Sequence, residues 1–397
     1  MIPYDKALEL ALSCVSKPLP TERVLLLDAI DRVLASDIYA NRDFPAFDNS
    51  AMDGFAIRAA SWDKELRLVG EIAAGEHKEI YLNSDEAIKV FTGGAIPSGA
   101  DCVVRVEDAV LDGNTLKVLK KPAVGQNIRK KGEELKLGEL VLKKGTHLRA
   151  YEIGLIAGFG IPVIEVYQKP VVGVLSTGDE ILDLGEQITK PTQIRSTNNY
   201  ALVARLSQIG ASTLHFGIFP DIKEQIAKAV ELALSRCDVV ITTGGVSAGE
   251  KDFVKEIIKD LGLELVFHKL LVKPAKPVLL AKGKDKLLFG LPGNPVSCLM
   301  ALDVLVKPVL LKLSGREDYL PKFEVATLKR AFKRSDAQRR EFLRGVCWSD
   351  SGKLFCDYSD KTQSHMLSSY IDANCYVIVP EGVSSLEEGQ KVEILRF

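Results

Sequence analysis

The sequence predicts a multidomain protein in which a central, doubly wound α/β domain with a mostly parallel sheet is accompanied by smaller β-rich domains. Between residues 170 and 318, apolar runs typical of buried strands alternate with amphipathic segments typical of helices. This alternation implies βαβ crossovers and a parallel sheet that is covered on both faces. A chain of 397 residues, 46% of them hydrophobic, is long enough for about two to four domains.

Changes in composition along the chain predict four domains. Residues 4–16 and 23–36 show helical periodicity, whereas residues 43–141 form short apolar runs broken by Gly, Asp and Asn, as in a small β domain. Residues 147–168 return to a helical pattern, so we expect the β domain to be inserted into an N-terminal domain that it splits. Short β-like runs return in residues 319–397. The expected domains are a split N-terminal domain (1–42 and 142–169), an inserted β domain (43–141), an α/β domain (170–318) and a C-terminal β-barrel domain (319–397).

The elements expected within the α/β segment follow from its hydrophobic pattern. Buried runs predict strands, and amphipathic runs that end at glycine, as the one before Gly210 does, predict helices. In chain order we expect strand 171–177, helix 199–210, strand 212–219, helix 222–235, strand 237–243, helix 252–262, strands 263–270, 277–283 and 287–291, and a long apolar helix to about residue 313.

Charge and cysteine content argue against several classes of protein. Lys and Arg total 52 and Asp and Glu total 53, so a net charge of -1 gives no electrostatic footprint for nucleic acid or an anionic membrane. The seven cysteines are scattered without a C-x-x-C pair, which disfavours a disulfide framework or a structural zinc site and fits a reducing cytoplasm. No basic leader precedes an apolar core, and the uncharged run 287–302 is too short to span a membrane. We therefore expect a soluble, cytoplasmic protein.

The stretch from residue 287 to 299, LLFGLPGNPVSCL, has the pattern of a buried strand that runs into a helix through a turn. Gly293 is expected to relieve the turn, Asn294 is a candidate N-cap, and Pro295 has the fixed φ favoured at the first helical position. Open N–H groups at such a helix start, with the hydroxyl of Ser297, would favour a phosphate or another tetrahedral oxyanion. An ordinary strand-to-helix turn would show the same pattern.

Three strand-end loops carry polar or glycine-rich candidates, and these are residues 176–180 (STGDE), 242–252 (TTGGVSAGEKD) and 291–297 (LPGNPVS). Ligands of parallel sheets sit beyond the carboxyl ends of the strands, so we expect the three loops to share one site. In the second loop, Gly244 and Gly245 would let the backbone approach a phosphate, with Ser247 as a donor. Glycines are also common in ordinary loops, so the combination of three loops carries the hypothesis.

The acidic residues near these loops allow two interpretations. Asp221 precedes a helical segment with Glu224 three residues later, so an N-cap with a capping-box partner would explain it. Asp252 opens another helix and has the same alternative. Asp179 and Glu180 follow a strand and could bind a divalent metal or a diol. Carboxylates close to a phosphoanhydride would repel it, and Mg²⁺ is the natural bridge because it takes oxygen ligands and keeps several waters.

Basic residues gather in the segment HKLLVKPAKP, which contains Lys269, Lys273 and Lys276. Pro274 and Pro277 prevent a continuous helix, so the last two lysines belong to a constrained loop. A lysine about 4 Å from an anion gains roughly 4 kcal/mol of gross Coulomb attraction at an effective dielectric near 20, but only about 1 kcal/mol in water. Exposed solubilising charge is the alternative, and a sheltered pocket would decide between the two.

Seven segments in order resemble the molybdopterin molybdenumtransferase family, which includes the E domain of gephyrin. They are NSAMDGFAIR (49–58), FTGGAIPSGADCVVRVED (91–108), NIRKKGEE (127–134), STGDE, TTGGVSAGEKD, KPAKP and LPGNPVS. The resemblance spans nearly the whole chain and implies an elongated homodimer of four-domain subunits with a split N-terminal domain. It also implies a reaction in which molybdate is inserted into the dithiolene of adenylylated molybdopterin, AMP is hydrolysed off, and the molybdenum cofactor is released.

The resemblance also implies roles for individual residues. The acids Glu180, Asp221 and Asp252 would surround substrate and Mg²⁺, and Glu134 would join them, although the family usually has Asp at that position. Substrate contacts would come from Lys269, Lys273, Gly244, Gly245, Ser247, Pro292, Gly293 and Asn294. The molybdate pocket would consist of Lys276, Ser297, Arg344 and Ser364, since two cations and two hydroxyls suit a tetrahedral dianion. Asp53 and Thr92 would reach the active site of the other subunit, with Asp53 counted among the catalytic acids.

Two other functions stay open. A molybdopterin adenylyltransferase would share the third domain but would not need residues 43–141 or the C-terminal domain; such an enzyme is also an implied protein partner. A non-catalytic, gephyrin-like scaffold would have no physical need for a converging oxyanion site. No histidine shows metal-ligand spacing, and no nucleophile has an obvious base. Direct attack by a metal-activated water or by a molybdate oxygen is therefore preferred over a covalent enzyme intermediate.

Overall fold

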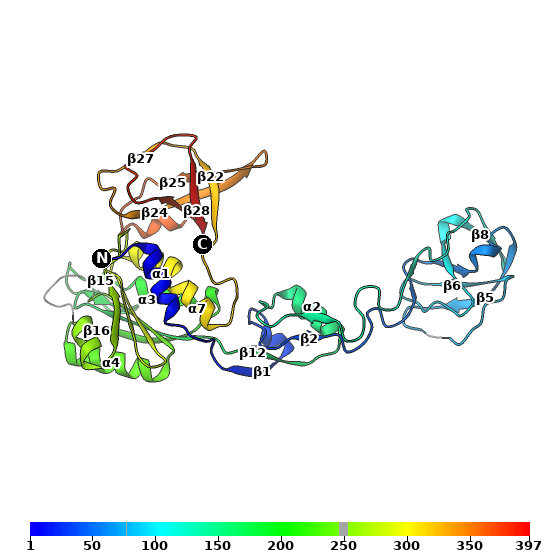
Figure 1. The fold of residues 1–397 in the computed structure, drawn as a ribbon, viewed down its shortest axis with the longest axis horizontal. Helices are drawn as coiled ribbons and strands as arrows, with labels where there is room; N and C mark the ends of the chain where they lie inside the picture. Colours follow the sequence, from blue (N-terminus) through cyan, green and yellow to red (C-terminus); the bar gives the residue numbers. More distant parts are fainter. Residues whose placement is uncertain (77, 246–252) are drawn as a thin grey trace. The chain divides into compact units, whose positions relative to one another are not determined.

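The structure is a computed structural model that describes residues 1–76, 78–245 and 253–397 (Figure 1). Its contacts divide the chain into two compact units. The first unit comprises Met1–Ala35, Gly145–Ala150 and Val163–Phe397, and the second comprises Ser36–Lys144 and Tyr151–Pro162. The second unit is therefore inserted into the first. The boundaries of the four expected domains stay predictions.

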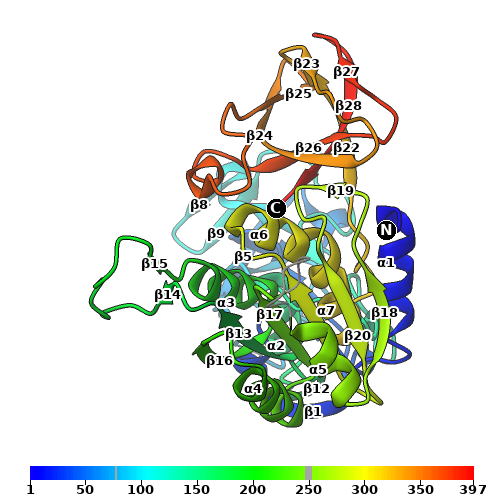
Figure 2. The same cartoon turned by 90° about the vertical axis from the view of Figure 1, so that its left-hand side faces the viewer.

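A six-stranded sheet forms the centre of the first unit, in the order β16-β13-β17-β21-β20-β18 (Figure 2). Its strands are β13 (Val171–Thr177), β16 (Ser212–Phe219), β17 (Val239–Thr243), β18 (Glu264–His268), β20 (Leu279–Lys282) and β21 (Leu287–Leu291). The first four strands in the order run parallel, whereas β20 and β18 are each antiparallel to a neighbour. The predicted, mostly parallel sheet is confirmed.

Helices cover both faces of this sheet, so the doubly wound arrangement is also confirmed. They are α1 (Tyr4–Ser13), α3 (Asn198–Ile209), α4 (Lys223–Arg236), α5 (Val254–Asp260), α6 (Pro295–Ala301) and α7 (Lys307–Leu313). Alternate residues of β17 point to opposite cores: Val239 and Ile241 pack with α1, α3, α6 and α7, whereas Val240 packs with α4 and α5. None of the described helices combines the length and apolar character needed to cross a membrane.

The predicted long apolar helix near residue 313 is interrupted by one π-helical segment, η4 (Leu302–Val306), between α6 and α7. Pro308 has no N–H, so the carbonyl of Val304 lacks the donor that an α-helix would provide four residues later. The hydroxyl of Tyr4 donates to this carbonyl at 3.1 Å and replaces the missing bond. The π-helix thus has a local cause and a specific partner in α1.

The C-terminal segment forms a closed five-stranded barrel. Its strands are β22 (Phe323–Leu328), β24 (Arg340–Asp350), β25 (Lys353–Tyr358), β26 (Cys375–Val379) and β28 (Lys391–Arg396), with a short pair β23 (Phe332–Lys333) and β27 (Ser385–Leu386) and the 3₁₀ turn η5 (Leu367–Tyr370). The barrel closes because β26 pairs with both β28 and β24. A two-residue strand of the α/β segment, β19 (Val272–Lys273), pairs with β24 and ties the barrel to it.

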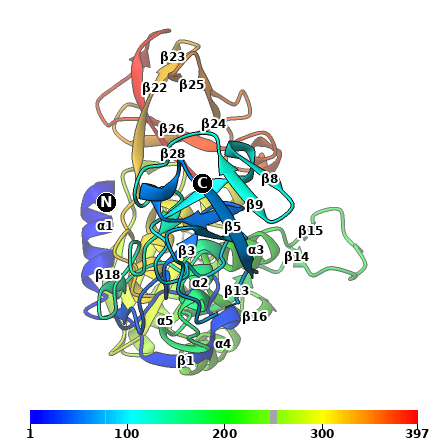
Figure 3. The ribbon, with the colours of Figure 1, turned by 90° about the vertical axis from the view of Figure 1, so that its right-hand side faces the viewer.

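The second unit contains the predicted small β domain. Its main sheet has the order β7-β4-β6-β5-β9-β8. Strands β5, β8 and β9 of this sheet are labelled in Figure 3. The elements of this unit are β2 (Ile38–Tyr39), β3 (Asn49–Ser50), β4 (Gly54–Ile57), η2 (Ala59–Ser61), β5 (Glu65–Ile72), β6 (Glu86–Val90), β7 (Cys102–Arg105), η3 (Val106–Asp108), β8 (Ala109–Asp112), β9 (Thr115–Val118), β10 (Ile128–Arg129), β11 (Leu140–Leu142) and α2 (Ala150–Gly158). Two cores, one on each side of the sheet, account for its apolar runs.

The helix predicted over residues 23–36 is wrong. Strand β1 (Thr21–Leu25) pairs with β12 (Val163–Tyr167), and the short 3₁₀ turn η1 (Leu26–Ala29) follows it. The apolar side chains that suggested a packing face do not form one, since Leu27 is 73% exposed and Ile30 is 47% exposed. Pairing with β12, which lies far away in the sequence, overrides the local periodicity.

We predict that Gly345→Ala destabilises the barrel by about 3 kcal/mol, because overpacking forces its surroundings apart. A Cβ on Gly345 would lie 2.4 Å from the carbonyl oxygen of Asp357 and 2.9 Å from a methyl of Val377. The chain has two tryptophans, Trp62 and Trp348. In a Trp62→Phe background, fluorescence of Trp348 in β24 would report barrel unfolding in a urea titration.

The matched control is Gly154→Ala, where a helical Cβ would have no neighbour within 4 Å. The same fluorescence transition should be unchanged there. An unaltered transition in Gly345→Ala would contradict the tight barrel closure described above.

Candidate active site

The carboxyl ends of β13, β17 and β21 bring the three predicted loops to one edge of the central sheet. The N–H of Gly244 donates to the carbonyl of Leu291 at 3.2 Å, which joins the second loop to the third. The amide of Asn198, at the start of α3, donates to the carbonyl of Gly293 at 2.7 Å. The described parts of the second and third loops therefore lie together, as predicted.

Gly244 allows its loop to pack closely against the end of β13. Its φ is +88°, and a Cβ there would lie 2.7 Å from the carbonyl oxygen and 2.9 Å from the hydroxyl of Thr177. Gly245 follows with φ +63°. Two consecutive positive φ values favour glycine strongly at both positions. The other predicted residues of this loop, Ser247 and Asp252, lie outside the described residues.

The Pro292-to-Ser297 turn differs in three ways from the expectation. Asn294 occupies the N-cap position and Pro295 the first helical position, but the Asn294 side chain makes no capping hydrogen bond. Gly293 is absent from the residues with positive φ, so the turn does not require glycine there. The N–H of Val296 is not open, because it donates to the carbonyl of Ser364 at 3.1 Å. A barrel loop, invisible to local pattern, covers this part of the helix start.

The acids lie on neighbouring loops of the same edge. A carboxylate oxygen of Asp179 accepts the N–H of Asp221 at 3.0 Å, which links the loops after β13 and β16. Helix α4 begins at Lys223 with Ile222 as N-cap and no side-chain cap, so the N-cap interpretation of Asp221 is wrong. Glu180 is exposed, and its carbonyl accepts the N–H of Ile194 at 2.9 Å. Within the described residues, no three His, Cys, Asp or Glu side chains are grouped for a metal ion.

The lysine loop is constrained, as predicted. Lys269 has φ +67° and donates its N–H to Val278 at 2.9 Å, while the carbonyl of exposed Lys276 accepts the N–H of Leu270 at 2.8 Å. The ammonium of Lys273 lies 2.9 Å from a carboxylate oxygen of Glu341. Glu341 is only 2% exposed in β24. Sequence reasoning missed Glu341, and no local pattern in this strand pointed to its ion pair with a distant loop.

Arg344 organises the barrel loop that reaches α6. Its side chain is 2% exposed, and its Nε donates to the hydroxyl of Ser369 at 3.0 Å. Its Nη2 donates to the carbonyls of Lys361 at 2.5 Å and Gln363 at 3.3 Å, just before Ser364. Among the described residues, Nη1 has no protein acceptor. Burial lowers the pKa of the Arg344 guanidinium from its ordinary value, because the charged form loses hydration.

The backbone contacts bring three of the four predicted molybdate ligands to the junction of barrel and α/β segment. Ser297 follows Val296, which bonds to Ser364, and Arg344 holds the residues just before Ser364. Strand β19, which ends three residues before Lys276, pairs with β24, which carries Arg344. Lys276 therefore belongs to a loop anchored at the same strand.

In the second unit, Asp53 and Thr92 form a direct pair. One carboxylate oxygen of Asp53 accepts the N–H of Thr92 at 2.7 Å and its hydroxyl at 2.8 Å. These two bonds lower the pKa of the Asp53 carboxyl below its ordinary value. Both side chains are exposed. Glu134 is exposed in the same unit, and its N–H donates to the carbonyl of Phe44 at 3.1 Å.

A second set of polar groups, which the predictions gave no individual roles, lies at the strand ends beneath the loops. The hydroxyls of Ser176 and Thr243 are 2.6 Å apart at the ends of β13 and β17. The side-chain oxygens of Thr177 and Asn198 are buried and have no protein partner. Threonine and serine at the ends of otherwise apolar strands were the available signal. Buried, unsatisfied oxygens at this edge are suited to donors from a ligand or water.

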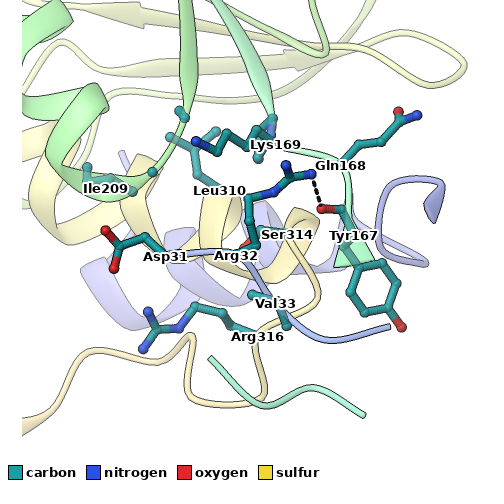
Figure 4. A pocket seen from close by; sticks show the side chains of 13 residues that line it. Asp31, Arg32, Val33, Tyr167, Gln168, Lys169, Ile209, Leu310, Ser314 and Arg316 are labelled. Carbon is teal, nitrogen blue, oxygen red and sulfur yellow. Dashed lines mark hydrogen bonds between the residues drawn. The ribbon is translucent and has the colours of Figure 1, made fainter. Parts of the chain in front are cut away.

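A cavity at the opposite edge of the sheet does not belong to this site. It is lined by Lys169 and Pro170 before β13 and by Gly210 after α3, with Arg32 donating to the carbonyl of Tyr167 at 2.8 Å (Figure 4). Its volume of about 20 Å³ is enough for about one water molecule. The candidate site therefore consists of the loops at the carboxyl edge.

Comparisons with known proteins cover nearly the whole chain. Three family models match in order: the MoeA N-terminal region (domain I and II) at residues 2–160, a probable molybdopterin binding domain at residues 173–312, and the MoeA C-terminal region (domain IV) at residues 325–397. Among solved structures, the MoeA molybdopterin biosynthesis protein of Pyrococcus horikoshii OT3 is 31% identical, with a TM-score of 0.85 and full coverage of both chains.

Curated relatives agree with these matches. The molybdopterin molybdenumtransferase of Haemophilus influenzae is 34% identical over 100% of this chain and 99% of its own. The enzyme of the same name from Bacillus subtilis is 35% identical over 99% of this chain and 94% of its own. The chain therefore belongs to the molybdopterin molybdenumtransferase family.

Proposed function

We propose that this protein inserts molybdate into the dithiolene of adenylylated molybdopterin and releases AMP, the final step in assembly of the molybdenum cofactor. One observation carries the proposal. The barrel loop with Ser364 is hydrogen-bonded to the start of α6 beside Ser297, and buried Arg344 holds that loop. These contacts support a site in which cationic and hydroxyl groups from two folded segments would converge beside the loops that would hold the nucleotide.

Molybdate, as a tetrahedral dianion, would be bound by Lys276, Ser297, Arg344 and Ser364. Arg344 offers Nη1 while its other nitrogens hold the loop, so its orientation is fixed before the anion arrives. Lys276 contributes an exposed cation on a constrained loop. Two positive charges and two hydroxyl donors match the charge and the oxygens of the anion.

The pyrophosphate and pterin of the substrate would lie on the loops at the carboxyl edge. Gly244 and Gly245 would let the backbone approach the phosphates closely, although the N–H of Gly244 is donated to Leu291, and Ser247, Pro292, Gly293 and Asn294 would complete the proposed surface. Lys269 would contact substrate directly. Lys273 is proposed as a substrate ligand too, and its ion pair with Glu341 would hold its ammonium in place until the phosphates compete for it.

Magnesium fits this edge through a small number of carboxylates. Mg²⁺ commonly takes one or two carboxylates together with substrate phosphates and several waters, so a dedicated cage of acids is not needed. Glu180, Asp221 and Asp252 are the proposed ligands from this edge, with Glu134 proposed from the second unit. When bound, the ion would neutralise the phosphoanhydride charge that these acids would otherwise repel.

In the proposed AMP-releasing step, the bond between the adenylyl phosphorus and the bridging oxygen breaks. When water attacks, its oxygen forms the new bond to phosphorus, AMP is released, and the bridging oxygen leaves with the molybdopterin phosphate. When a molybdate oxygen attacks instead, the first product is an adenylyl–molybdate anhydride, and water must then cleave its P–O–Mo linkage to release AMP. An acid at this edge would accept the proton of an attacking water, and Asp221 is the proposed acid. Its backbone N–H donates to the carboxylate of Asp179, which links its loop to the one after β13. No covalent bond to the protein is required.

The exposed Asp53–Thr92 pair is also given a role in the proposal. We propose a homodimer in which this pair, from the second unit of one subunit, completes the site of the other, with Asp53 as a catalytic acid. The molybdopterin adenylyltransferase that would make the substrate is a proposed partner for direct transfer. A cytoplasmic location is also proposed, because all seven cysteines are free thiols, as expected in a reducing compartment.

The central experiment incubates the purified protein with adenylylated molybdopterin and Mg²⁺, with or without molybdate. AMP release should depend on molybdate, and the product should reconstitute an apo-molybdoenzyme. Absence of AMP in both conditions while substrate still binds would favour the scaffold. AMP-linked product made from ATP and molybdopterin would favour the adenylyltransferase.

We predict that Lys276→Ala raises the molybdate concentration for half-maximal AMP release about 10- to 100-fold, since a charge-assisted hydrogen bond contributes about 1.5–3 kcal/mol. The assay is AMP release over a molybdate titration. Lys284→Ala is the matched control, because exposed Lys284 precedes β21 and lies at the opposite end of that strand. Equal effects of the two substitutions would argue against Lys276 in the pocket.

Mixing two impaired chains tests the shared site, at a molybdate concentration that supports AMP release by wild type but not by Lys276→Ala. If Asp53→Ala and Lys276→Ala chains are mixed after reversible dissociation, half of the dimers should be mixed and each should hold one intact site. About a quarter of wild-type AMP release should return under random pairing. A site built within one chain would leave no intact site in any dimer, and no activity would return.

A further inference from the structure

A buried chain of polar side chains connects the π-helix to the barrel. Arg205 of α3 donates through Nε to Asp303 Oδ1 at 2.8 Å, and the hydroxyl of Tyr376 in β26 donates to Asp303 Oδ2 at 2.8 Å. The hydroxyls of Tyr376 and Tyr370 are also 2.8 Å apart. Asp303 is 7% exposed and Tyr376 is fully buried. A buried carboxylate of this kind is costly unless paired, and here both of its oxygens have partners.

The direction of the hydrogen bonds follows from the number of protons. Tyr376 has one hydroxyl hydrogen, which goes to the carboxylate of Asp303. Tyr370 must therefore donate to Tyr376, and its 3.4 Å contact with the carbonyl of Val296 is the weaker of its two options. Burial raises the pKa of Tyr376 well above its ordinary value, so this hydroxyl keeps its hydrogen.

The chain ends at the proposed oxyanion pocket. Tyr376 is the direct cross-strand partner of Arg344 in the β24–β26 pair, so both side chains lie on one face of the sheet. Tyr370 belongs to η5, where the neighbouring hydroxyl of Ser369 accepts the Nε of Arg344 at 3.0 Å. Tyr370 also contacts Val296, whose N–H holds Ser364. Holding the two tyrosines in place thus holds Arg344 and the loop of residues 361–369.

We propose that Asp303, Tyr376 and Tyr370 are positioning residues, which hold Arg344 and residues 361–369 in the arrangement that binds molybdate. The inference rests on the proposed function for the identity of the anion, but its structural part does not. The π-helix matters here because Asp303 is one of its five buried residues. The two tyrosines connect this carboxylate to the barrel through hydrogen bonds.

Tyr376→Phe removes one hydroxyl and keeps the ring contacts with Phe342 and Phe397. We expect the half-saturating molybdate concentration for AMP release to rise about tenfold, while the KM for adenylylated molybdopterin changes less than about twofold. Tyr358→Phe is the matched control. It removes a hydroxyl of the same barrel that donates to Ala331 at 2.9 Å, outside the buried chain.

Hydrogen exchange tests the positioning without any substrate. Peptides containing residues 361–369 and Val296 should exchange about tenfold faster in Tyr376→Phe than in wild type, but not in Tyr358→Phe. Unchanged exchange and an unchanged molybdate titration in Tyr376→Phe would overturn the inference. If wild-type protein releases no AMP, the proposed function fails, whereas faster exchange confined to Tyr376→Phe would still support the structural part.

A fold defect is separated from a positioning defect by two further variants. Asp303→Asn keeps the size of the side chain and should reproduce the tenfold effect, and Tyr370→Phe should shift the molybdate titration in the same direction. If Tyr376→Phe does not fold, these two variants decide the matter by the same exchange and titration measurements. Wild-type behaviour in both would rule out the proposed role.

Discussion

The parallel pairing of β13, β17 and β21 is the constraint on which the candidate site depends. Parallel strands share one direction, so the residues that follow each of them lie at the same edge of the sheet, whatever the sequence of the loops. The helices on both faces bury the apolar side chains of the sheet. Loops far apart in the chain, such as those at Thr177 and Leu291, therefore become neighbours.

Closure of the edge requires a second constraint, which the barrel provides. Strand β19 leaves the α/β segment to pair with β24, and the Lys273–Glu341 ion pair lies at this crossing. The barrel loop before Ser364 then reaches the start of α6. A sheet edge alone offers backbone donors, whereas the barrel adds a fixed guanidinium and hydroxyls. The chemistry of the candidate site thus depends on the α/β segment and the barrel being joined at this crossing.

The α/β segment could be predicted from the sequence because each of its elements has a local signal. Continuous apolar runs mark β17 and β21, Gly210 ends α3 in the left-handed region, and Pro295 begins α6. The N-terminal segment gave the opposite result. Its leucines have helical spacing, but Leu25 and Leu27 are exposed beside a strand whose partner lies far along the chain. Local periodicity carries no information about such a partner.

The same division holds within the candidate site. Glycine pairs and strand-end acids could be identified locally, and the family resemblance added the barrel residues Arg344 and Ser364. What could not be predicted is which hydrogen bonds and ion pairs these groups form. The Val296 N–H is taken by Ser364, Asn294 does not cap, and Lys273 has Glu341 as a partner. Each of these depends on a contact between segments that no local pattern relates.

The π-helix has a consequence for sequence variation. All five of its residues, Leu302 to Val306, are at most 7% exposed. A helix normally has one face where substitutions are tolerated, but here the sheet, α1, α3 and the barrel surround the segment on every side. This short stretch therefore offers no neutral position, and natural variation in it should be restricted to coordinated changes with its neighbours.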